Sequence, residues 1–368
     1  MQVRIGIDGR KIPDAAKRGP VDSVRHAHEL GMEGVFFRTV LDMSPTLDPG
    51  LLRDIRDTAD ELGLYLESGL GKVNPFASGE APELRRIGDG DTLLGFTRMI
   101  RACAEIGCTE LWAGTANRQP YPGRFSYDRF RSDAPWEEQL AATGRFLKKL
   151  APVLRETGVH LNLETHEEVT SFEVVRLVEE VGPDVVGIVF DTSNVLHRAE
   201  DPVRAAHRVA PYVRQTHLKD AVIVPAPGGV ILQTRPIGDG VVDFSQLVPV
   251  ILAENPAVNL TMESRQPDDE AIKSYPTFDV KKRPNITGTL VEVYNEDWLA
   301  GHPDLTVEEF AAYLQLSREG EENIAKGGIP SLEDYAAADY YYAEAVEFIQ
   351  RGARHLRNIV DRQPAVAA

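Results

Sequence analysis

Short apolar runs alternate along this chain with longer segments in which apolar residues recur at helical spacing. Short apolar runs bounded by turn residues are typical of buried strands, and apolar residues three or four positions apart indicate amphipathic helices. The pattern predicts eight strands, over Val3–Asp8, Gly34–Thr39, Leu64–Gly69, Glu110–Thr115, His160–Thr165, Val186–Asp191, Val213–Leu218 and Asn259–Glu263. It predicts a helix after each strand, over Pro20–Leu30, Pro49–Leu62, Thr92–Ile106, Pro135–Glu156, Phe172–Val181, Pro202–Ala210, Phe244–Glu254 and Leu332–Asp361.

Glycine stands just after four of the predicted helices, at Gly31, Gly63, Gly107 and Gly158. Glycine is favoured directly past a helix C-terminus because it adopts the left-handed conformation without strain. Strands that alternate with helices predict parallel βαβ units, and eight such units predict an α/β fold of the (β/α)8 TIM-barrel class. The alternative, a doubly wound open sheet, normally carries a glycine-rich phosphate loop after its first strand. The segment IDGRKIPD at this place is not such a loop.

Two segments interrupt the alternation of strands and helices. Asp220–Asp243 is predicted to be an extended loop rich in proline and glycine, and Gln266–Ser331 a long insertion after the eighth strand. Long loops at the C-terminal face of a barrel usually form lids or substrate walls. We therefore expect one TIM-barrel domain over residues 1–368, with a barrel core at 1–265, an insertion or lid at 266–331 and a closing C-terminal helix at 332–362.

The chain is acidic, with 57 Asp and Glu against 40 Lys and Arg and a formal charge of -17 over 368 residues. A field of this sign repels nucleic-acid phosphates and anionic membranes, so we expect neither as a partner. No apolar run is long enough to span a bilayer, and the N-terminus lacks the apolar stretch of a signal peptide. We therefore expect a cytoplasmic protein, in which the two cysteines, Cys103 and Cys108, are reduced and buried.

Acidic residues and one histidine stand at the ends of four consecutive predicted strands: Glu164, Asp191, His217 and Glu263. Side chains at the C-terminal ends of barrel strands converge on one mouth. Three buried carboxylates repel one another and take up protons unless a cation neutralises them. One imidazole with three oxygen donors suits Mn²⁺, Mg²⁺ or Co²⁺ better than a sulfur-rich zinc site. The sequence therefore predicts one divalent metal, with Mn²⁺ preferred.

Five segments carry a resemblance to a known family: LNLETH, VGIVFDTSN, YVRQTHLKD, RPIGDGVVDFSQL and LTMESR. They resemble the sugar-phosphate isomerase/epimerase-like superfamily, also called xylose isomerase-like barrels, which includes ketose 3-epimerases, hydroxypyruvate isomerases and inosose dehydratases. The resemblance covers residues 1–265 and is most specific in the succession D-T-x-N, H-x-K-D, G-x-G-x-x-D and E. In that family Glu, Asp, His and Glu from strands five to eight bind the metal, and these match Glu164, Asp191, His217 and Glu263.

The resemblance implies a metal-dependent isomerase or epimerase of a sugar or keto-sugar, acting by proton transfer through a metal-stabilised enediolate. It assigns the proton-transferring pair to Glu164 and Glu263. The chain departs from the ketose 3-epimerases at two places, because Asn194 stands where they carry histidine and Ile223 where they carry arginine. Their substrate clamp is therefore not reproduced.

His166 lies two residues past Glu164 and is expected to point the same way along the strand. This Glu-x-His pair is similar to the metal-binding subunits of C-glycoside deglycosidases, which use a histidine base on 3-keto-glycosides. His166 is therefore a third candidate catalytic residue. The resemblance leaves open a lyase or dehydratase acting on a keto-inositol or a 3-keto-glycoside, and a loop role for His166 also stays open.

Six further residues are candidate substrate-binding groups: Arg38, Glu67, Trp112, Asn194, Lys219 and Arg265. Structural alternatives are a salt bridge between Arg38 and Glu67, simple packing of Trp112, and pairing of Lys219 with Asp220. A DNA-repair nuclease on the same barrel needs a three-zinc cluster with more histidines, whereas only His166 and His217 of nine fall at predicted strand ends. A non-catalytic metal-binding subunit is a remoter alternative. We expect a small-molecule sugar substrate and a homo-oligomer, or a hetero-complex with a small partner subunit.

Overall fold

The structure, a computed structural model, describes residues 3–78, 81–116, 128–270 and 284–362. Eight parallel strands form one sheet in the order β10 (Leu260–Met262), β1 (Ile5–Asp8), β2 (Gly34–Phe36), β3 (Tyr65–Lys72), β4 (Glu110–Gly114), β5 (His160–Glu164), β6 (Val186–Asp191) and β7 (Val213–His217). A parallel bridge between Leu218 and Met262 joins β7 to β10 and closes the ring. The predicted TIM barrel is confirmed.

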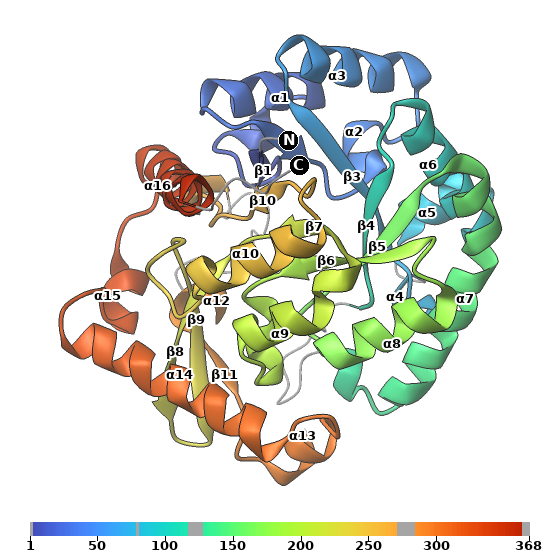
Figure 1. The fold of residues 1–368 in the computed structure, drawn as a ribbon. Helices are drawn as coiled ribbons and strands as arrows, with labels where there is room; N and C mark the ends of the chain where they lie inside the picture. Colours follow the sequence, from blue (N-terminus) through green and yellow to red (C-terminus); the bar gives the residue numbers. More distant parts are fainter. Residues whose placement is uncertain (1–2, 79–80, 117–127, 271–283, 363–368) are drawn as a thin grey trace.

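Helices surround the strands (Figure 1). Those that follow the barrel strands are α1 (Pro20–Glu29), α3 (Pro49–Glu61), α6 (Thr92–Glu105), α7 (Trp136–Thr157), α8 (Ser171–Val181), α9 (Pro202–Val209), α10 (Phe244–Glu254) and α16 (Tyr342–Asp361). Shorter elements join them: α2 (Val40–Met43), α4 (Pro75–Ser78), α5 (Pro82–Ile87), and the 3-10 turns η1 (Ala15–Lys17), η2 (Asp128–Phe130), η3 (Asn194–Arg198) and η4 (Ala210–Tyr212).

Capping residues explain where these helices begin and end. The side chains of Asp48, Asp91 and Asp201 accept hydrogen bonds from the first backbone N–H groups of α3, α6 and α9. These bonds satisfy donors that have no partner inside the helix. The glycines predicted just past four helices all have positive φ, as expected: Gly31 (80°), Gly63 (70°), Gly107 (70°) and Gly158 (67°).

Strand β3 is longer than its predicted counterpart, which ended at Gly69. The pairing of β3 with β4 shifts register between Gly69 and Gly71, where the chain bulges, and Gly71 takes φ 107°. A bulge adds a residue and bends the strand without ending it. As a result the C-terminal end of β3 is Lys72, and Glu67 lies well inside the barrel.

The extended loop predicted over 220–243 is instead a hairpin, so that prediction was wrong. Strands β8 (Asp220–Ala226) and β9 (Gly229–Arg235) pair antiparallel, and β11 (Thr289–Val291) extends their sheet. Their alternating apolar residues pack on Tyr313 of α14 (Val307–Ala325) and form a second apolar core. Figure 1 shows this sheet and α14 to one side of the barrel. Helices α12 (Pro284–Thr287) and α13 (Glu296–Ala300) complete the described part of the predicted insertion, of which residues 271–283 lie outside the described ranges.

The single C-terminal helix predicted over Leu332–Asp361 is two helices, α15 (Leu332–Ala337) and α16. The chain is extended at Ala338, with ψ 144°. Tyr340, in the break, donates its hydroxyl to the carbonyl of Arg265 at 3.0 Å and accepts from the backbone N–H of Asp268 at 2.8 Å. These tertiary hydrogen bonds replace helical ones, which explains the interruption.

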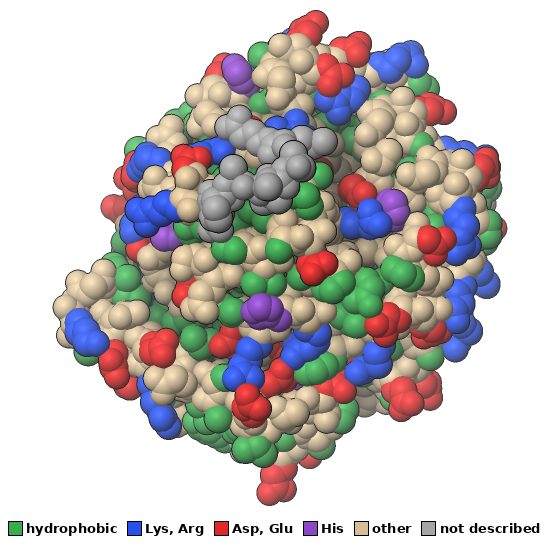
Figure 2. All heavy atoms as spheres, viewed as in Figure 1, with side chains coloured by type: hydrophobic (Ala, Val, Ile, Leu, Met, Phe, Trp, Pro, Cys, Tyr) green, Lys and Arg blue, Asp and Glu red, His purple; other side chains and the backbone are tan. Residues whose placement is uncertain are grey.

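The surface agrees with the mixed charge of the sequence. Figure 2 shows acidic and basic side chains interspersed over the face in view. Within the described ranges, no helix combines the length and the apolar character that crossing a membrane requires.

Candidate functional site

Four side chains converge at the C-terminal ends of neighbouring barrel strands. Glu164 ends β5, Asp191 ends β6, His217 ends β7, and Glu263 directly follows β10. One potential ligand atom from each residue lies within 4.8 Å of the others. The structure therefore brings together the four residues that the sequence predicts as metal ligands.

His217 lies between the two glutamates. Its Nδ1 is 2.9 Å from Oε1 of Glu164 and 3.5 Å from Oε1 of Glu263. The ring of Phe36 packs on the imidazole with centroids 4.5 Å apart. The side chains of Glu164 and His217 are 3% and 1% exposed, whereas that of Glu263 is 17% exposed. Glu263 is thus the carboxylate of this group that solvent or a substrate reaches most easily.

Asp191 is held by backbone and lysine donors together. Its Oδ1 accepts from the N–H groups of Ser193 and Asn194, each at 3.0 Å. Its Oδ2 is 2.8 Å from Nζ of Lys219, which also lies 3.3 Å from Oε2 of Glu263 and donates to Oδ1 of Asn194 at 3.1 Å. Lys219 therefore bridges two of the predicted ligands, and Asn194 lies at the same place.

Two threonines fix the ends of these strands. Thr165 Oγ1 accepts from the N–H of Asp191 at 2.9 Å and donates to its carbonyl at 3.1 Å. Thr192 Oγ1 does the same for Lys219, at 2.9 and 2.6 Å. Asp220, the alternative partner of Lys219, instead accepts from backbone N–H groups including those of Gly238 and Gly240. The D-T-x-N and H-x-K-D segments thus lock each other in register.

Burial and the nearby charges shift the pKa values of these four residues. Burial raises the pKa of Asp191 to about 7, against the effect of Lys219. Burial lowers the pKa of His217, but its hydrogen bond to Glu164 and the surrounding carboxylates outweigh this and raise it to about 9. Burial also opposes ionisation of Glu263, yet Lys219 and His217 lower its pKa to about 2. Protons bound to His217 and Asp191 therefore offset part of the negative charge of this group, and a divalent cation would offset it better.

The donor set fits a hard divalent cation. Three carboxylates and one imidazole offer oxygen and nitrogen ligands without sulfur, a combination suited to Mg²⁺, Mn²⁺ or Co²⁺. The ligand atoms are close enough to share one ion. The backbone and threonine contacts described above supply the outer support that orients metal ligands.

His166 is tied to a buried glutamate that the sequence did not single out. Its Nδ1 contacts the carboxylate of Glu168, and its Nε2 lies 3.5 Å from Nζ of Lys72 and 3.9 Å from Oε2 of Glu164. Glu168 also accepts from Thr115 Oγ1 at 2.6 Å. Burial opposes ionisation of Glu168, but the positive charge and hydrogen bond of His166 lower its pKa to about 2. An ionised Glu168 would hold the proton of His166 on Nδ1 and leave Nε2 facing the mouth.

Trp112 lies beside the cluster with two cations on its ring. Its Nε1 donates to Oε2 of Glu164 at 2.9 Å. The guanidinium carbon of Arg38 is 4.8 Å and Nζ of Lys72 is 5.3 Å from a ring centroid of Trp112. Lys72 was missed because the predicted strand ended three residues before it. The signal that would have found it is the G-x-G sequence before it, which marks a bulge.

Asp8 is a second residue that the sequence analysis missed. It ends β1, is 3% exposed and accepts from the N–H of Arg10 at 2.8 Å. Burial and the neighbouring charge of Glu263 raise its pKa. Its strand-end position, the same signal that identified Asp191, would have placed it at the mouth.

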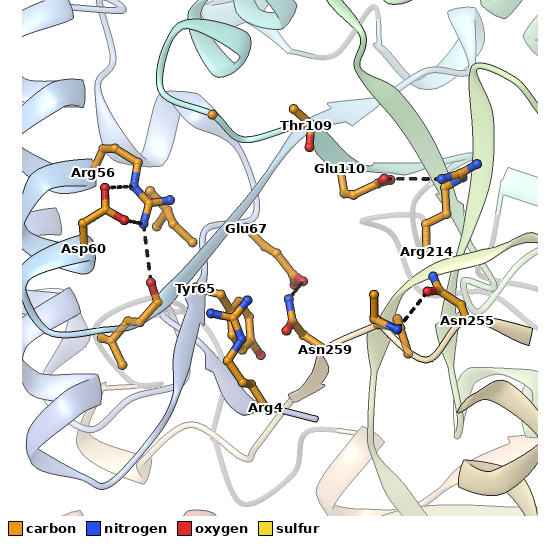
Figure 3. Close-up of a pocket in the computed structure, with 15 residues that line it drawn as sticks. Arg4, Arg56, Asp60, Tyr65, Glu67, Thr109, Glu110, Arg214, Asn255 and Asn259 are labelled. Carbon is orange, nitrogen blue, oxygen red and sulfur yellow. Dashed lines mark hydrogen bonds and ion pairs between the residues drawn. The ribbon is translucent and has the colours of Figure 1, made fainter. Parts of the chain in front are cut away.

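Glu67 is not brought to the mouth. Its carboxylate accepts from Asn259 Nδ2 at 3.0 Å and Thr261 Oγ1 at 2.9 Å. It lines a cavity of about 500 Å³ together with Arg4 and Tyr65, near the N-terminal ends of the strands (Figure 3). Because β3 continues to Lys72, Glu67 lies too early in the strand to reach the C-terminal face.

Arg265 is likewise turned away from the cluster. Its Nη2 donates to Oδ1 of Asp268 at 2.6 Å, and its guanidinium lies 4.3 Å from the ring centroid of Tyr340. Alternation along the strand predicted a shared face with Glu263, but β10 ends at Met262, so the alternation does not extend to Arg265. The structure thus gives Arg265 an ion-pair partner and an aromatic partner outside the cluster.

Comparison with known proteins identifies sequence relatives of several activities. The chain is 34% identical over 94 residues to the uncharacterized protein YihM of Escherichia coli K12, covering 26% of this chain and 29% of YihM. It is 32% identical over 92 residues to an inosose dehydratase of Geobacillus kaustophilus, covering 24% of this chain and 29% of that enzyme. It is 25% identical over 219 residues to a 3-oxo-isoapionate decarboxylase of Pectobacterium atrosepticum, covering 59% and 67%. The first two matches thus span less than a third of each relative.

Solved structures share the fold over most of the chain. The 3-keto-D-glucoside 4-epimerase YcjR of E. coli gives a TM-score of 0.54 at 17% identity, covering 74% of this chain and 96% of that one. A D-psicose 3-epimerase with D-tagatose from Clostridium cellulolyticum H10 gives 0.55 at 14% identity, covering 86% and 98%. A magnesium complex of a xylose isomerase-like TIM-barrel protein from Mycobacterium smegmatis gives 0.53 at 16% identity, covering 86% and 97%.

The family comparison covers more than half of the chain. Residues 24–278 match the xylose isomerase-like TIM barrel. This range begins in α1 and includes Glu164, Asp191, His217 and Glu263, which together form the acid–histidine cluster. The match agrees with the family resemblance of the sequence. The chain belongs to the xylose isomerase-like TIM-barrel family.

Proposed function

We propose that this protein is a divalent-metal-dependent isomerase or epimerase of a sugar or keto-sugar, acting by proton transfer through an enediolate. The observation that carries the proposal is the meeting of Glu164, Asp191, His217 and Glu263 within 4.8 Å at the mouth of the barrel. Mouths of this kind hold the active sites of TIM-barrel enzymes. The fold is shared with solved ketose epimerases, which supports this class of reaction.

The four residues are the proposed ligands of one divalent ion, with Mn²⁺ preferred and Mg²⁺ or Co²⁺ as alternatives. The magnesium complex of the M. smegmatis relative supports a divalent ion in this fold. Such an ion would act as a Lewis acid on a sugar carbonyl and lower the energy of the enediolate. Lys219, bonded to Asp191 and Asn194, would bind a substrate oxygen beside it.

Glu164 and Glu263 are the proposed proton-transferring pair. Their carboxylates lie on either side of His217 Nδ1, at 2.9 and 3.5 Å. Neighbouring positive charges keep both pKa values below the usual range, so both are ionised and able to accept a proton. One carboxylate removing the carbon-bound proton and the other returning it would invert the carbon between them.

A lyase or dehydratase acting on a keto-inositol or a 3-keto-glycoside is the second candidate, including cleavage of the C-glycoside deglycosidase type. The contact between His166 and Glu168 favours it, because a histidine with a carboxylate behind it is a suitable general base. The inosose dehydratase and decarboxylase among the sequence relatives are in keeping with this reaction class.

Deuterium incorporation separates the two candidates. Manganese-loaded protein is incubated in D₂O with D-fructose, D-psicose, 2-keto-D-gluconate, a 3-keto-glucoside and an inosose, and followed by proton NMR. Exchange at the carbon next to the carbonyl without elimination supports the isomerase or epimerase, and release of water or an aglycone supports the lyase. Glu164→Gln should abolish either reaction, whereas His166→Asn should abolish elimination alone.

A further inference from the structure

Arg38 and Lys72 both lie on the side chain of Trp112, and within the described ranges neither forms an ion pair with a carboxylate. Both lie on the ring of Trp112, at 4.8 and 5.3 Å from a ring centroid. Among residues 3–78, 81–116, 128–270 and 284–362, neither cation forms an ion pair with an acidic side chain. Carboxylates lie nearby at the mouth of the barrel, but their contacts are with other side chains.

The absent partner is explained by contacts already made. Glu168, the acid with the largest effect on Lys72, is occupied by His166 Nδ1 and by Thr115. Among the described residues, the one hydrogen-bonding contact of Lys72 Nζ is with Nε2 of His166, at 3.5 Å. Arg38 and Lys72 are half-buried, and a partly desolvated cation without an ion-pair partner is unfavourable, so this arrangement favours the binding of an anion. Burial lowers the pKa of Lys72 to about 8; the charge of Glu168 opposes this shift, and that of Arg38 adds to it.

Two glycines make room for this cluster. A Cβ on Gly69 would stand 2.4 Å from the carbonyl oxygen of Arg38 and 2.8 Å from that of Trp112. A Cβ on Gly114 would stand 2.5 Å from Nζ of Lys72. A side chain at Gly69 would clash with backbone atoms, and one at Gly114 would displace the ammonium of Lys72. The absence of side chains at these points of β3 and β4 therefore leaves room for the backbone of Arg38 and the ammonium of Lys72 beside Trp112.

We propose that Arg38 and Lys72 bind the carboxylate of the substrate, so that the substrate is a keto-sugar acid and not a neutral sugar. This inference rests on the proposed function and names its substrate class. The guanidinium fork matches a carboxylate with two parallel hydrogen bonds, and the ammonium adds a second charge. Trp112 connects this position directly to Glu164 through its Nε1. A sugar acid bound there would extend its polyol chain toward the acid–histidine cluster.

Calorimetric binding of a matched pair of polyols tests the inference without turnover. D-gluconate and D-glucitol share one carbon chain and differ in the carboxylate. We expect manganese-loaded wild type to bind gluconate at least about tenfold more tightly, the scale of one charge-assisted contact. Arg38→Gln and Lys72→Met should each remove most of this preference. Arg4→Gln is the matched control, because Arg4 also stacks on an aromatic ring, 5.0 Å from Tyr65, at the other end of the barrel (Figure 3).

Equal binding of the two polyols by wild type, or a preference that persists in both mouth variants, would overturn the inference. Tighter binding of D-glucitol 6-phosphate than of gluconate would assign the position to a phosphate and overturn the carboxylate. If gluconate is preferred but no sugar exchanges deuterium, the proposed reaction fails and the carboxylate site stands. If D-fructose exchanges as fast as 2-keto-D-gluconate, the reaction stands and the carboxylate site fails.

Discussion

The indole Nε1 of Trp112 donates a hydrogen bond to Oε2 of Glu164 at 2.9 Å, across the boundary between β4 and β5. Both residues are almost fully buried, at 2% exposure each. The bond occupies one carboxylate oxygen and leaves Oε1 directed at His217. The sequence predicted that Trp112 binds substrate or simply packs, and this hydrogen bond is a further contact that neither prediction includes. We therefore expect Trp112 to orient a proposed metal ligand.

Removal of that hydrogen bond should weaken metal binding. Trp112→Phe keeps the aromatic bulk and deletes the donor, and loss of such outer contacts typically costs about 10–100-fold in metal affinity or activity. Manganese affinity measured by calorimetry checks this. Trp136→Phe is the control, because Trp136 Nε1 donates to Glu173 at 3.1 Å away from the cluster. Equal losses in the two variants would contradict an orienting role for Trp112.

Metal binding should tighten as pH rises. The pKa of Asp191 is raised to about 7 and that of His217 to about 9, so both hold protons at pH 6. A metal must displace these protons, and binding therefore releases them. Calorimetry at pH 6.0 and 8.5 in two buffers of different ionisation enthalpy should show stronger binding at the higher pH and the release of more protons at the lower. A pH-independent affinity with no proton release would contradict the account.

Binding of D-gluconate should weaken above about pH 8 once the protein is saturated with manganese. Burial lowers the pKa of Lys72 to about 8, so its positive charge is present below this pH and lost above it. The charged and titratable groups that act on Lys72 are Arg38, His166, Glu164, Glu167 and Glu168, and the ring of Trp112 lies against it. Lys72→Arg keeps the charge at all these pH values and should bind gluconate equally at pH 7 and pH 9. The same decline in both proteins would assign the pH effect to another group.

Gly114→Ala should reproduce the effect of Lys72→Met on gluconate binding. The added methyl group would stand 2.5 Å from Nζ of Lys72 and displace the ammonium, while the four proposed ligands keep their contacts. We expect the preference for gluconate over glucitol to fall and the manganese affinity to remain. Gly19→Ala is the control, since a Cβ there meets nothing within 4 Å. An unchanged preference in Gly114→Ala would show that Lys72 does not depend on this gap.

The ends of the barrel strands can be predicted from the sequence where the strands are regular. Predicted strands five to seven end within one residue of β5, β6 and β7 because each is a short buried run ended by a polar residue. The position of Glu164, Asp191 and His217 at one rim therefore follows from the sequence alone. Glu263 follows because β10 closes the barrel beside β7.

Prediction from the sequence is wrong where tertiary contacts or bulges determine the course of the backbone. The glycines around Leu70 suggest a strand end, but they permit a bulge that carries β3 on to Lys72. This displaces Glu67 from the mouth. The hairpin of β8 and β9 was hidden by its proline and glycine residues, although its apolar residues alternate. Asp268 and Tyr340 are remote from the barrel strands in sequence, so their hold on Arg265 was not predictable from strand periodicity.

The most direct measurement is anomalous diffraction at the manganese edge from crystals grown with MnCl₂. We predict one strong anomalous peak from a manganese ion that Glu164, Asp191, His217 and Glu263 coordinate. This peak should be lost in crystals of Asp191→Asn. No peak at this position in wild type, or a peak that the substitution leaves unchanged, would contradict the metal centre on which the proposed reaction depends.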